Sequence, residues 1–183
     1  MANIFLIADT HFGHANILKF TQKDGITPIR LVPETSEPFN SVEAMDEYMV
    51  MKWNSVVKPS DHVYHLGDVV LKAPGLGIIK RLNGHKRLVR GNHDIFKTRQ
   101  YIEAGFDEIY GVRILDDMIL SHIPLHPLSV KARWFGNVHG HLHNSLPQFG
   151  VGPNYYNVSV EMIDYTPVPL EVVKQRLKAN KHE

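Results

Sequence analysis

The stretch IFLIADTH, residues 4–11, joins an apolar run to an aspartate and a histidine. The run 4–8 is short and contains no polar side chain, which is typical of a strand buried on both faces of a sheet. Asp9 and His11 follow where this strand should end. Ligand sites in open α/β sheets form at the carboxyl ends of strands, so we expect both residues to lie at such a site.

Other apolar segments of the chain end in the same way. Residues 62–66, 87–90 and 118–121 are short strand candidates, and each precedes a side chain that could bind a ligand. Loops that follow such strands can converge at one edge of a sheet although they are far apart in sequence. The side chains in question are Asp68, Asn92 and His122.

Helical periodicity is clearest after Ser41, which has a side chain suited to a helix N-cap. The segment KPSD, residues 58–61, should end this helix. Apolar residues recur at helical spacing between these two points, and we expect the stripe that they form to face the core. Its members are Val42, Met45, Met49, Trp53 and Val56.

The remaining segments alternate between helix and strand and then cluster as strands. Residues 21–40 are rich in Pro, Thr and Ser and predict a long loop. This order favours an α/β fold with layered sheets, and no linker divides it, so we expect one domain over residues 1–183. The other expected elements are helices at 76–82, 98–104 and 169–178, a hairpin formed by 108–115 and 118–121, and strands at 136–139 and 156–160.

The composition of the chain excludes several classes of protein. With 183 residues, 43% of them hydrophobic, the chain is long enough for a real core. The absence of cysteine excludes disulfides, thiolate zinc sites and a cysteine nucleophile. Twenty basic residues against nineteen acidic ones give a net charge of +1, which does not indicate a nucleic-acid binder. The twelve histidines are the unusual feature.

Targeting and membrane signals are absent from the sequence. The apolar run 4–8 lacks a basic leader and is followed by Asp9, unlike a signal peptide. No segment approaches the ~20 apolar residues of a membrane-spanning helix. We therefore expect a cytoplasmic protein without a membrane partner, and the sequence carries no mark of its oligomeric state.

Short polar motifs follow one another in a defined order along the chain. They are Asp-x-His at 9–11, Gly-Asp at 67–68, Gly-Asn-His-Asp at 91–94, a histidine at 122, and Gly-His-x-His at 140–143. Each motif is weak alone, but the ordered set resembles the calcineurin-like metallophosphoesterase superfamily, in particular its small uncapped bacterial and phage-type members. The resemblance implies a four-layer αββα sandwich of two mixed β-sheets flanked by helices.

The resemblance also implies two metal ions and a role for each motif residue. Asp68 would bridge the two ions with its carboxylate. His93 would face the substrate, and Asp94 would orient it. The first ion would be bound by Asp9, His11 and His143, and the second by Asn92, His122 and His141.

The donor set agrees with this assignment. Imidazole, carboxylate and amide ligands suit borderline ions, so we expect two divalent ions per chain, Mn²⁺ first, with Fe²⁺, Zn²⁺ and Ni²⁺ as alternatives. A hydroxide bridging such ions would attack phosphorus in line, and His93 would protonate the leaving oxygen. The expected activity is hydrolysis of a small phosphomonoester or phosphodiester, such as a nucleotide.

The motif residues also allow other interpretations. Taken singly, each motif residue could be an ordinary loop or cap residue. A nuclease is a second hypothesis, and a non-catalytic protein-binding scaffold on the same fold is a third. The basic residues within 80–90 suit either a rim for an extended anionic substrate or, more simply, solvated ends of a helix and a strand. His14 and His139 are near-site candidates, and residues 15–60 carry no motif that we can interpret.

Overall fold

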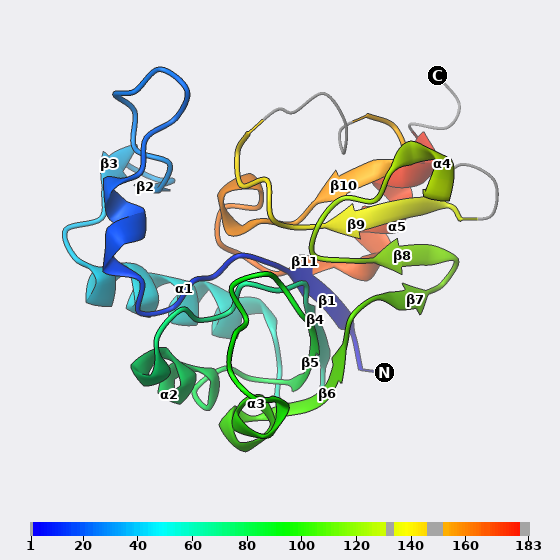
Figure 1. The fold of residues 1–183 in the computed structure, drawn as a ribbon, viewed down its shortest axis with the longest axis horizontal. Coiled ribbons are helices and arrows are strands. Elements are labelled where there is room, and N and C mark those ends of the chain that lie inside the picture. The colour runs from blue at the N-terminus through cyan, green and yellow to red at the C-terminus, as the bar shows by residue number, and fades with distance from the viewer. Residues whose placement is uncertain (1, 131–133, 146–151, 180–183) are drawn as a thin grey trace.

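Two mixed β-sheets pack together between helices (Figure 1). This arrangement is the αββα sandwich that the family resemblance implies. Leu6 of the first sheet and Val138 of the second belong to one cluster of buried apolar side chains. The computed structural model describes residues 2–130, 134–145 and 152–179.

The first sheet has β1 next to its edge, in the strand order β11-β1-β4-β5-β6. Four of these strands run parallel, and the short β11 pairs antiparallel with β1. β1 is short and largely buried, as expected from its apolar sequence. The strands are β1 (Ile4–Ile7), β4 (His62–His65), β5 (His85–Val89), β6 (Phe106–Tyr110) and β11 (Val168–Pro169).

The second sheet has the order β10-β9-β8-β7. β8 and β10 run parallel to β9, and β7 forms an antiparallel hairpin with β8. A parallel bridge between Ala8 and Ser159 links the chain beyond β1 to the chain beyond β10. The strands are β7 (Arg113–Leu115), β8 (Met118–Leu120), β9 (Gly136–His139) and β10 (Tyr155–Asn157).

Helices cover the outer faces of the two sheets. Figure 1 shows α1, α2 and α3 beside the first sheet and α5 against the second. Leu177 of α5 reaches Gly136 of β9, and Trp53 of α1 stacks over His65 of β4. None of the described helices combines the length and apolar character that crossing a membrane requires. The helices are α1 (Val42–Val56), α2 (Leu76–Ile79), α3 (Thr98–Ala104), α4 (Pro127–Val130) and α5 (Leu170–Ala179).

Short elements complete the chain. The expected loop 21–40 is mostly irregular, but it contains a small antiparallel hairpin of β2 and β3. These elements are η1 (Ala15–Lys19), β2 (Leu31–Val32), β3 (Glu37–Pro38), η2 (Ala73–Gly75) and η3 (Val160–Met162).

The expectation of one continuous strand over 108–115 is wrong. The chain leaves the first sheet after Tyr110 and enters the second at Arg113, so that β6 and β7 belong to different sheets. Alternating apolar residues report burial on one face, and they do not report which sheet supplies it. The helix expected at 76–82 is likewise shorter, because α2 ends at Ile79.

Ser41 caps α1 as expected. Its Oγ accepts a hydrogen bond of 3.1 Å from the backbone N–H of Ala44, which is otherwise an unpaired donor at the helix start. Met45, Met49 and Trp53 of the predicted stripe are buried. The cap and the stripe therefore set where α1 begins and which face it presents to the sheet.

Replacing Ser41 by alanine should lower the free energy of unfolding by about 1 kcal/mol, because the Ala44 N–H loses its partner. Urea denaturation measures this change. Ser55→Ala is the matched control, since the Ser55 hydroxyl donates to the Lys52 carbonyl within the same helix and caps nothing. Equal stability of the wild-type and Ser41→Ala proteins would contradict the capping role.

Candidate metal centre

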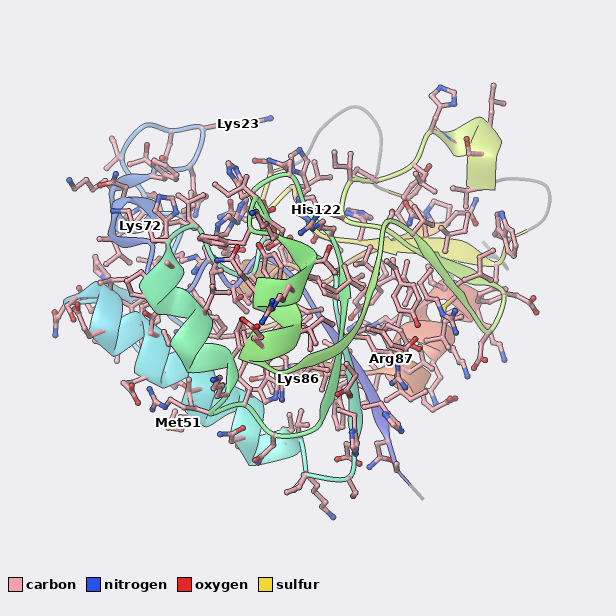
Figure 2. The ribbon with its side chains drawn as sticks, turned by 60° about the horizontal axis from the view of Figure 1, so that its bottom comes forward. Lys23, Met51, Lys72, Lys86, Arg87 and His122 are labelled. Atoms are coloured by element: carbon pink, nitrogen blue, oxygen red, sulfur yellow. The ribbon has the colours of Figure 1, made fainter. Side chains whose placement is uncertain are left out.

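The predicted site residues converge at the carboxyl ends of strands from both sheets. Figure 2 shows His122 among the loops that meet there. Parallel strands end at the same edge, which brings together residues that are far apart in the sequence. Asp9 follows β1, Asp68 follows β4, Asn92 follows β5, His122 follows β8, and His141 follows β9.

Asp9, His11 and His143 form one compact group. Each offers a ligand atom, and these atoms lie within 4.8 Å of one another. The rings of His11 and His143 stack with their centroids 5.3 Å apart. Asp9 and His11 are buried, whereas His143 is partly buried.

Asp68, His122 and His141 form a second group, whose ligand atoms also lie within 4.8 Å of one another. Nδ1 of His122 lies 2.8 Å from the Leu66 carbonyl oxygen, which calls for a proton on Nδ1. Nε2 of His122 lies 2.9 Å from Oδ1 of Asn92 and 3.3 Å from Oδ2 of Asp68. Electron-pair donors this close need a cation or a proton among them.

Asp68 lies between the two groups. Its Oδ2 is 3.6 Å from Nε2 of His11 in the first group and 3.3 Å from Nε2 of His122 in the second. Its Oδ1 accepts a 2.8 Å hydrogen bond from the backbone N–H of His93. One carboxylate therefore faces donors of both groups.

Buried polar atoms without partners test whether a cation fits the first group. Among the described residues, Oδ1 of Asp9 and both ring nitrogens of His11 make no hydrogen bond. Buried polar atoms are normally paired, and leaving them unpaired is costly. A divalent cation would satisfy the Asp9 oxygen and one ring nitrogen of His11, so the donor set fits a metal.

Burial and neighbouring charges shift the pKa values of these groups. Burial raises the pKa of Asp9 to about 6, although His143 and His122 act in the opposite direction. Burial, together with the Arg30 guanidinium, lowers the pKa of His11 to about 2, so the ring is neutral and keeps a lone pair. Burial disfavours the charged form of Asp68, but the hydrogen bond and charge of His122 bring its pKa down to about 2.

The backbone of most of the candidate ligands is unusual. Five of the seven have a positive φ angle, in a region that residues other than glycine rarely occupy. Such conformations cost on the order of 1 kcal/mol each and cluster at functional sites. The residues are Asp9 (60°), His11 (48°), Asp68 (56°), His141 (68°) and His143 (49°).

Two motif glycines allow the loops to touch the carboxylates. A Cβ on Gly91 would lie 2.3 Å from Oδ1 of Asp68, and one on Gly140 would lie 2.3 Å from Oδ2 of Asp9. The same Asp9 oxygen accepts a 2.8 Å hydrogen bond from the backbone N–H of His141. Glycine at these positions is therefore a steric requirement of the close approach.

His93 lies at the mouth of the centre. Its ring centroid is 5.6 Å from that of His11, and the residue is exposed. His14 also lies nearby, with its ring centroid 5.8 Å from that of His11. His139, by contrast, is fully buried beside Tyr155.

The hydrogen bonds of Asp94 go mainly to backbone groups of neighbouring turns. Its carboxylate accepts hydrogen bonds from the backbone N–H groups of Asp68 (2.8 Å), Val69 (3.0 Å) and Gly91 (2.8 Å), and one of 3.2 Å from the Tyr101 hydroxyl. None of the hydrogen bonds found for Asp94 in the described chain involves the His93 ring. Asp94 instead ties the turn of Gly91 to the turn of Asp68.

Two of the basic residues within 80–90, Lys86 and Arg87, lie away from the centre, whereas Arg90 lines a cavity together with Asn92 and His122. Lys86 and Arg87 are well apart from His122 in Figure 2. Nζ of Lys86 donates to the carbonyl oxygens of Leu82 and Gly84, and Nε of Arg87 pairs with Glu108 at 2.8 Å. Lys86 is buried and Arg87 is ion-paired, so these two cations make structural contacts and form neither a solvated end nor a rim for an anionic substrate.

Three supporting residues were missed by sequence reasoning. Oε1 of Glu161 lies 2.9 Å from Nδ1 of His143 and 2.8 Å from Nε of Arg30. Nδ2 of Asn157 donates a 2.8 Å hydrogen bond to the His143 carbonyl oxygen. A signal was present, because Arg30 and Glu161 are charged residues inside the apolar runs 29–32 and 160–163.

The pKa of Glu161 reflects this environment. Burial alone would raise the pKa, but the charge of Arg30 and the hydrogen bond from His143 bring it down to about 2. Glu161 is therefore an anion next to a candidate metal ligand.

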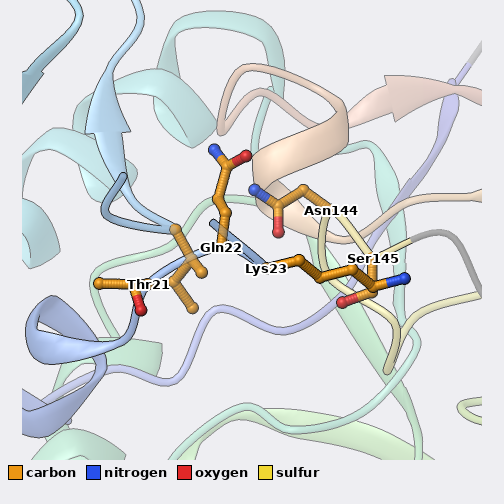
Figure 3. A pocket seen from close by; sticks show the side chains of 6 residues that line it. Thr21, Gln22, Lys23, Asn144 and Ser145 are labelled. Atoms are coloured by element: carbon orange, nitrogen blue, oxygen red, sulfur yellow. The ribbon is translucent and has the colours of Figure 1, made fainter. Parts of the chain in front are cut away.

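Cavities adjoin the centre on two sides. One of about 310 Å³ lies beside the His143 loop, where Gln22 and Lys23 face Asn144 and Ser145 (Figure 3). Another, of about 320 Å³, has His122 in its wall, together with Arg90, Asn92 and apolar side chains. Both could admit parts of a substrate.

Comparisons with known proteins agree with this geometry. The chain is 33% identical to the uncharacterized protein MJ1445 of Methanocaldococcus jannaschii, over 99% of its own length and 94% of that protein. A crystal structure of the protein of unknown function AQ665 from Aquifex aeolicus superposes with a TM-score of 0.71 at 27% identity, covering 96% of this chain and 99% of that one. No protein-family model matches the chain.

More distant structures include two enzymes. Nuclease MPE of Pseudomonas putida aligns with a TM-score of 0.48 at 17% identity, over 76% of this chain and 61% of that one. An archaeal phosphodiesterase aligns with a TM-score of 0.46 at 16% identity, over 86% of this chain and 82% of that one.

The near-complete match to MJ1445 places the two proteins in one family. The ordered motifs meet around Asp68 between two facing sheets, and the chain belongs to the calcineurin-like metallophosphoesterase superfamily.

Proposed function

We propose that the protein is a phosphoesterase that depends on two divalent cations. The position of Asp68 carries the proposal, because one carboxylate faces histidines of both groups at 3.3 and 3.6 Å. Asp68 would be shared between the cations. Asp9, His11 and His143 would hold one cation, and Asn92, His122 and His141 would hold the other.

The chain's own residues leave this centre suited to an anionic ligand. Asp9 and Asp68 are the carboxylates among the proposed ligands, so two divalent cations would keep a net positive charge. When bound, such cations lower the pKa of a coordinated water and offset charge on phosphoryl oxygens. Mn²⁺ is the proposed ion, since mixed nitrogen and oxygen donors suit borderline metals.

His93 is the proposed proton donor to the oxygen that leaves phosphorus. Its ring is exposed at the mouth of the centre, where it can reach a substrate. The backbone N–H of His93 is held by Asp68, and Asp94 holds the same turn through Gly91. Asp94 thus positions His93 through the backbone.

The proposed substrate is a small phosphomonoester or phosphodiester, such as a nucleotide. The centre opens at its partly buried and exposed members, His143 and His93, and the adjoining cavities could hold groups on either side of phosphorus. Lys86 and Arg87 lie away from His122, so they do not form a continuous basic track there for a nucleic-acid backbone.

Hydrolysis of bis-p-nitrophenyl phosphate and of p-nitrophenyl phosphate tests the function directly. We expect turnover that needs Mn²⁺ and stops with a chelator. Asp68→Ala should lower it by at least about 100-fold, since loss of a partner behind a metal ligand already costs 10–100-fold. Asp107→Ala, at an exposed aspartate on β6, is the control.

Three outcomes would contradict this function. The first is the absence of metal-stimulated turnover of either ester by the wild-type protein. The second is fewer than one bound ion per chain without rescue by Mn²⁺, which would favour a scaffold. The third is cleavage of single-stranded DNA that falls steeply with salt, without turnover of the small esters, which would identify a nuclease.

The close approach at Gly140 gives a second prediction. Gly140→Ala places a methyl group against Oδ2 of Asp9, so Asp9 must shift. We expect Mn²⁺ affinity to fall by about 10-fold or more, as measured by isothermal titration calorimetry. Gly77→Ala is the matched control, because a Cβ at Gly77 meets nothing within 4 Å. Wild-type affinity in Gly140→Ala would show that the contact does not place Asp9.

The proton-donor role of His93 predicts a dependence on the leaving group. His93→Ala should slow hydrolysis of an alkyl phosphate by roughly 10²–10⁴-fold, because the alkoxide needs a proton as it departs. Hydrolysis of a p-nitrophenyl ester should slow much less, since nitrophenolate is a good leaving group. Steady-state kinetics of both esters measure this difference, with the exposed His126→Ala as control. Equal losses on the two esters would refute the role.

A further inference from the structure

We propose that Glu161 and Arg30 are positioning residues for His143, and that together they set the cation affinity of the Asp9–His11–His143 group. The proposal builds on the proposed function, which makes this group a cation site. It assigns a role to Arg30, within the segment 15–60 that carries no interpretable motif. The inference rests on the contacts of one carboxylate and one guanidinium.

Glu161 acts on the ring of His143. Its Oε1 lies 2.9 Å from Nδ1 of that ring. A carboxylate at this distance holds the proton on Nδ1 and leaves the lone pair on Nε2, the nitrogen left to face a cation. Asn157 holds the backbone of His143 at the same time, through its carbonyl oxygen. The ring is thereby fixed in both orientation and tautomer.

Arg30 connects this carboxylate to the opposite side of the group. Its side chain is fully buried, and its Nε donates to Oε1 of Glu161 at 2.8 Å. Its Nη1 donates to the Thr10 carbonyl oxygen at 2.9 Å, and its Nη2 donates to that of Asp9. One rigid guanidinium therefore contacts the loop that carries Asp9 and His11 and the support of His143.

Stability alone is a poor explanation for this pair. Burying two charges costs hydration free energy that their mutual attraction only just offsets. Proteins with apolar replacements of similar size are often as stable. Oε2 of Glu161 is also buried without a hydrogen-bond partner among the described residues. A pair kept for stability would satisfy both oxygens. The Arg30–Glu161 pair instead contacts the residues around a candidate cation site.

Arg30 also ties a neighbouring segment to the centre. Ile29, the residue before it, lines the 310 Å³ cavity together with Gln22 and with Asn144, the residue after His143 (Figure 3). Changes at Arg30 should therefore disturb the cavity as well as the cation site. Changes at Glu161 should act mainly through His143, which makes Glu161 the sharper place for a test.

The test measures Mn²⁺ binding by isothermal titration calorimetry in two backgrounds. His122→Ala should weaken Mn²⁺ binding at the second group and leave the Asp9–His11–His143 group intact, whereas His11→Ala should do the reverse. We expect Glu161→Gln to weaken binding about 10–100-fold in the His122→Ala background and to leave it unchanged in the His11→Ala background. A merely structural role would weaken both groups alike.

Glu108→Ala is the matched control. Glu108 is paired with Nε of Arg87 at 2.8 Å, the same distance as in the Arg30–Glu161 pair, but it lies on β6 with an exposed side chain. The Glu108→Ala protein should bind Mn²⁺ as the wild-type protein does. The double variant Arg30→Met with Glu161→Gln removes both buried charges and keeps the side-chain volumes, so it should fold even where a single change leaves a charge unpaired.

Each outcome decides the proposal. Weaker binding confined to the first group, in a protein with the wild-type circular dichroism spectrum, supports it. Wild-type affinity in the first group, equal weakening of both groups, or failure of both Glu161→Gln and the double variant to fold would overturn it. Mn²⁺ binding without turnover of any phosphoester would defeat the proposed function and leave this inference standing.

Discussion

The carboxylate of Asp68 is the point on which the loops of both sheets depend. Its Oδ2 faces His11 from the loop after β1 and His122 from the loop after β8. Its Oδ1 holds the backbone of His93 after β5. A buried carboxylate with this many neighbours leaves little freedom to the segments around it. The close contact of Gly91 and the backbone hydrogen bonds to Asp94 are consequences of that crowding.

The centre is costly without a cation. Burial raises the pKa of Asp9 to about 6 and, together with Arg30, lowers the pKa of His11 to about 2, so burial disfavours the charged form of both residues. Unpaired buried atoms on the same two residues add a desolvation cost, and the positive φ angles add strain. These features would be stabilised by a bound cation.

Much of the fold could be predicted from local patterns. The Ser41 cap and the apolar stripe of α1 are read directly from side-chain chemistry and a period of 3.6 residues. The break between β6 and β7 could not be predicted, because the same alternation suits either sheet. The contacts of the Asp94 carboxylate could not be predicted either. A motif names an aspartate next to a histidine, but only packing decides whether that carboxylate meets the ring or the backbone of another turn.

The sequence by itself determined the ordered donor motifs, the superfamily, and the strand ends that carry Asp9, Asp68, Asn92 and His122, because residue type and periodicity are local properties. The tertiary structure decided which donors share a group and what stands behind them. Glu161 and Arg30 are separated by 131 positions in the chain. No local pattern can place one guanidinium against both Glu161 and the loop of Asp9, since that contact exists only after the two sheets have packed.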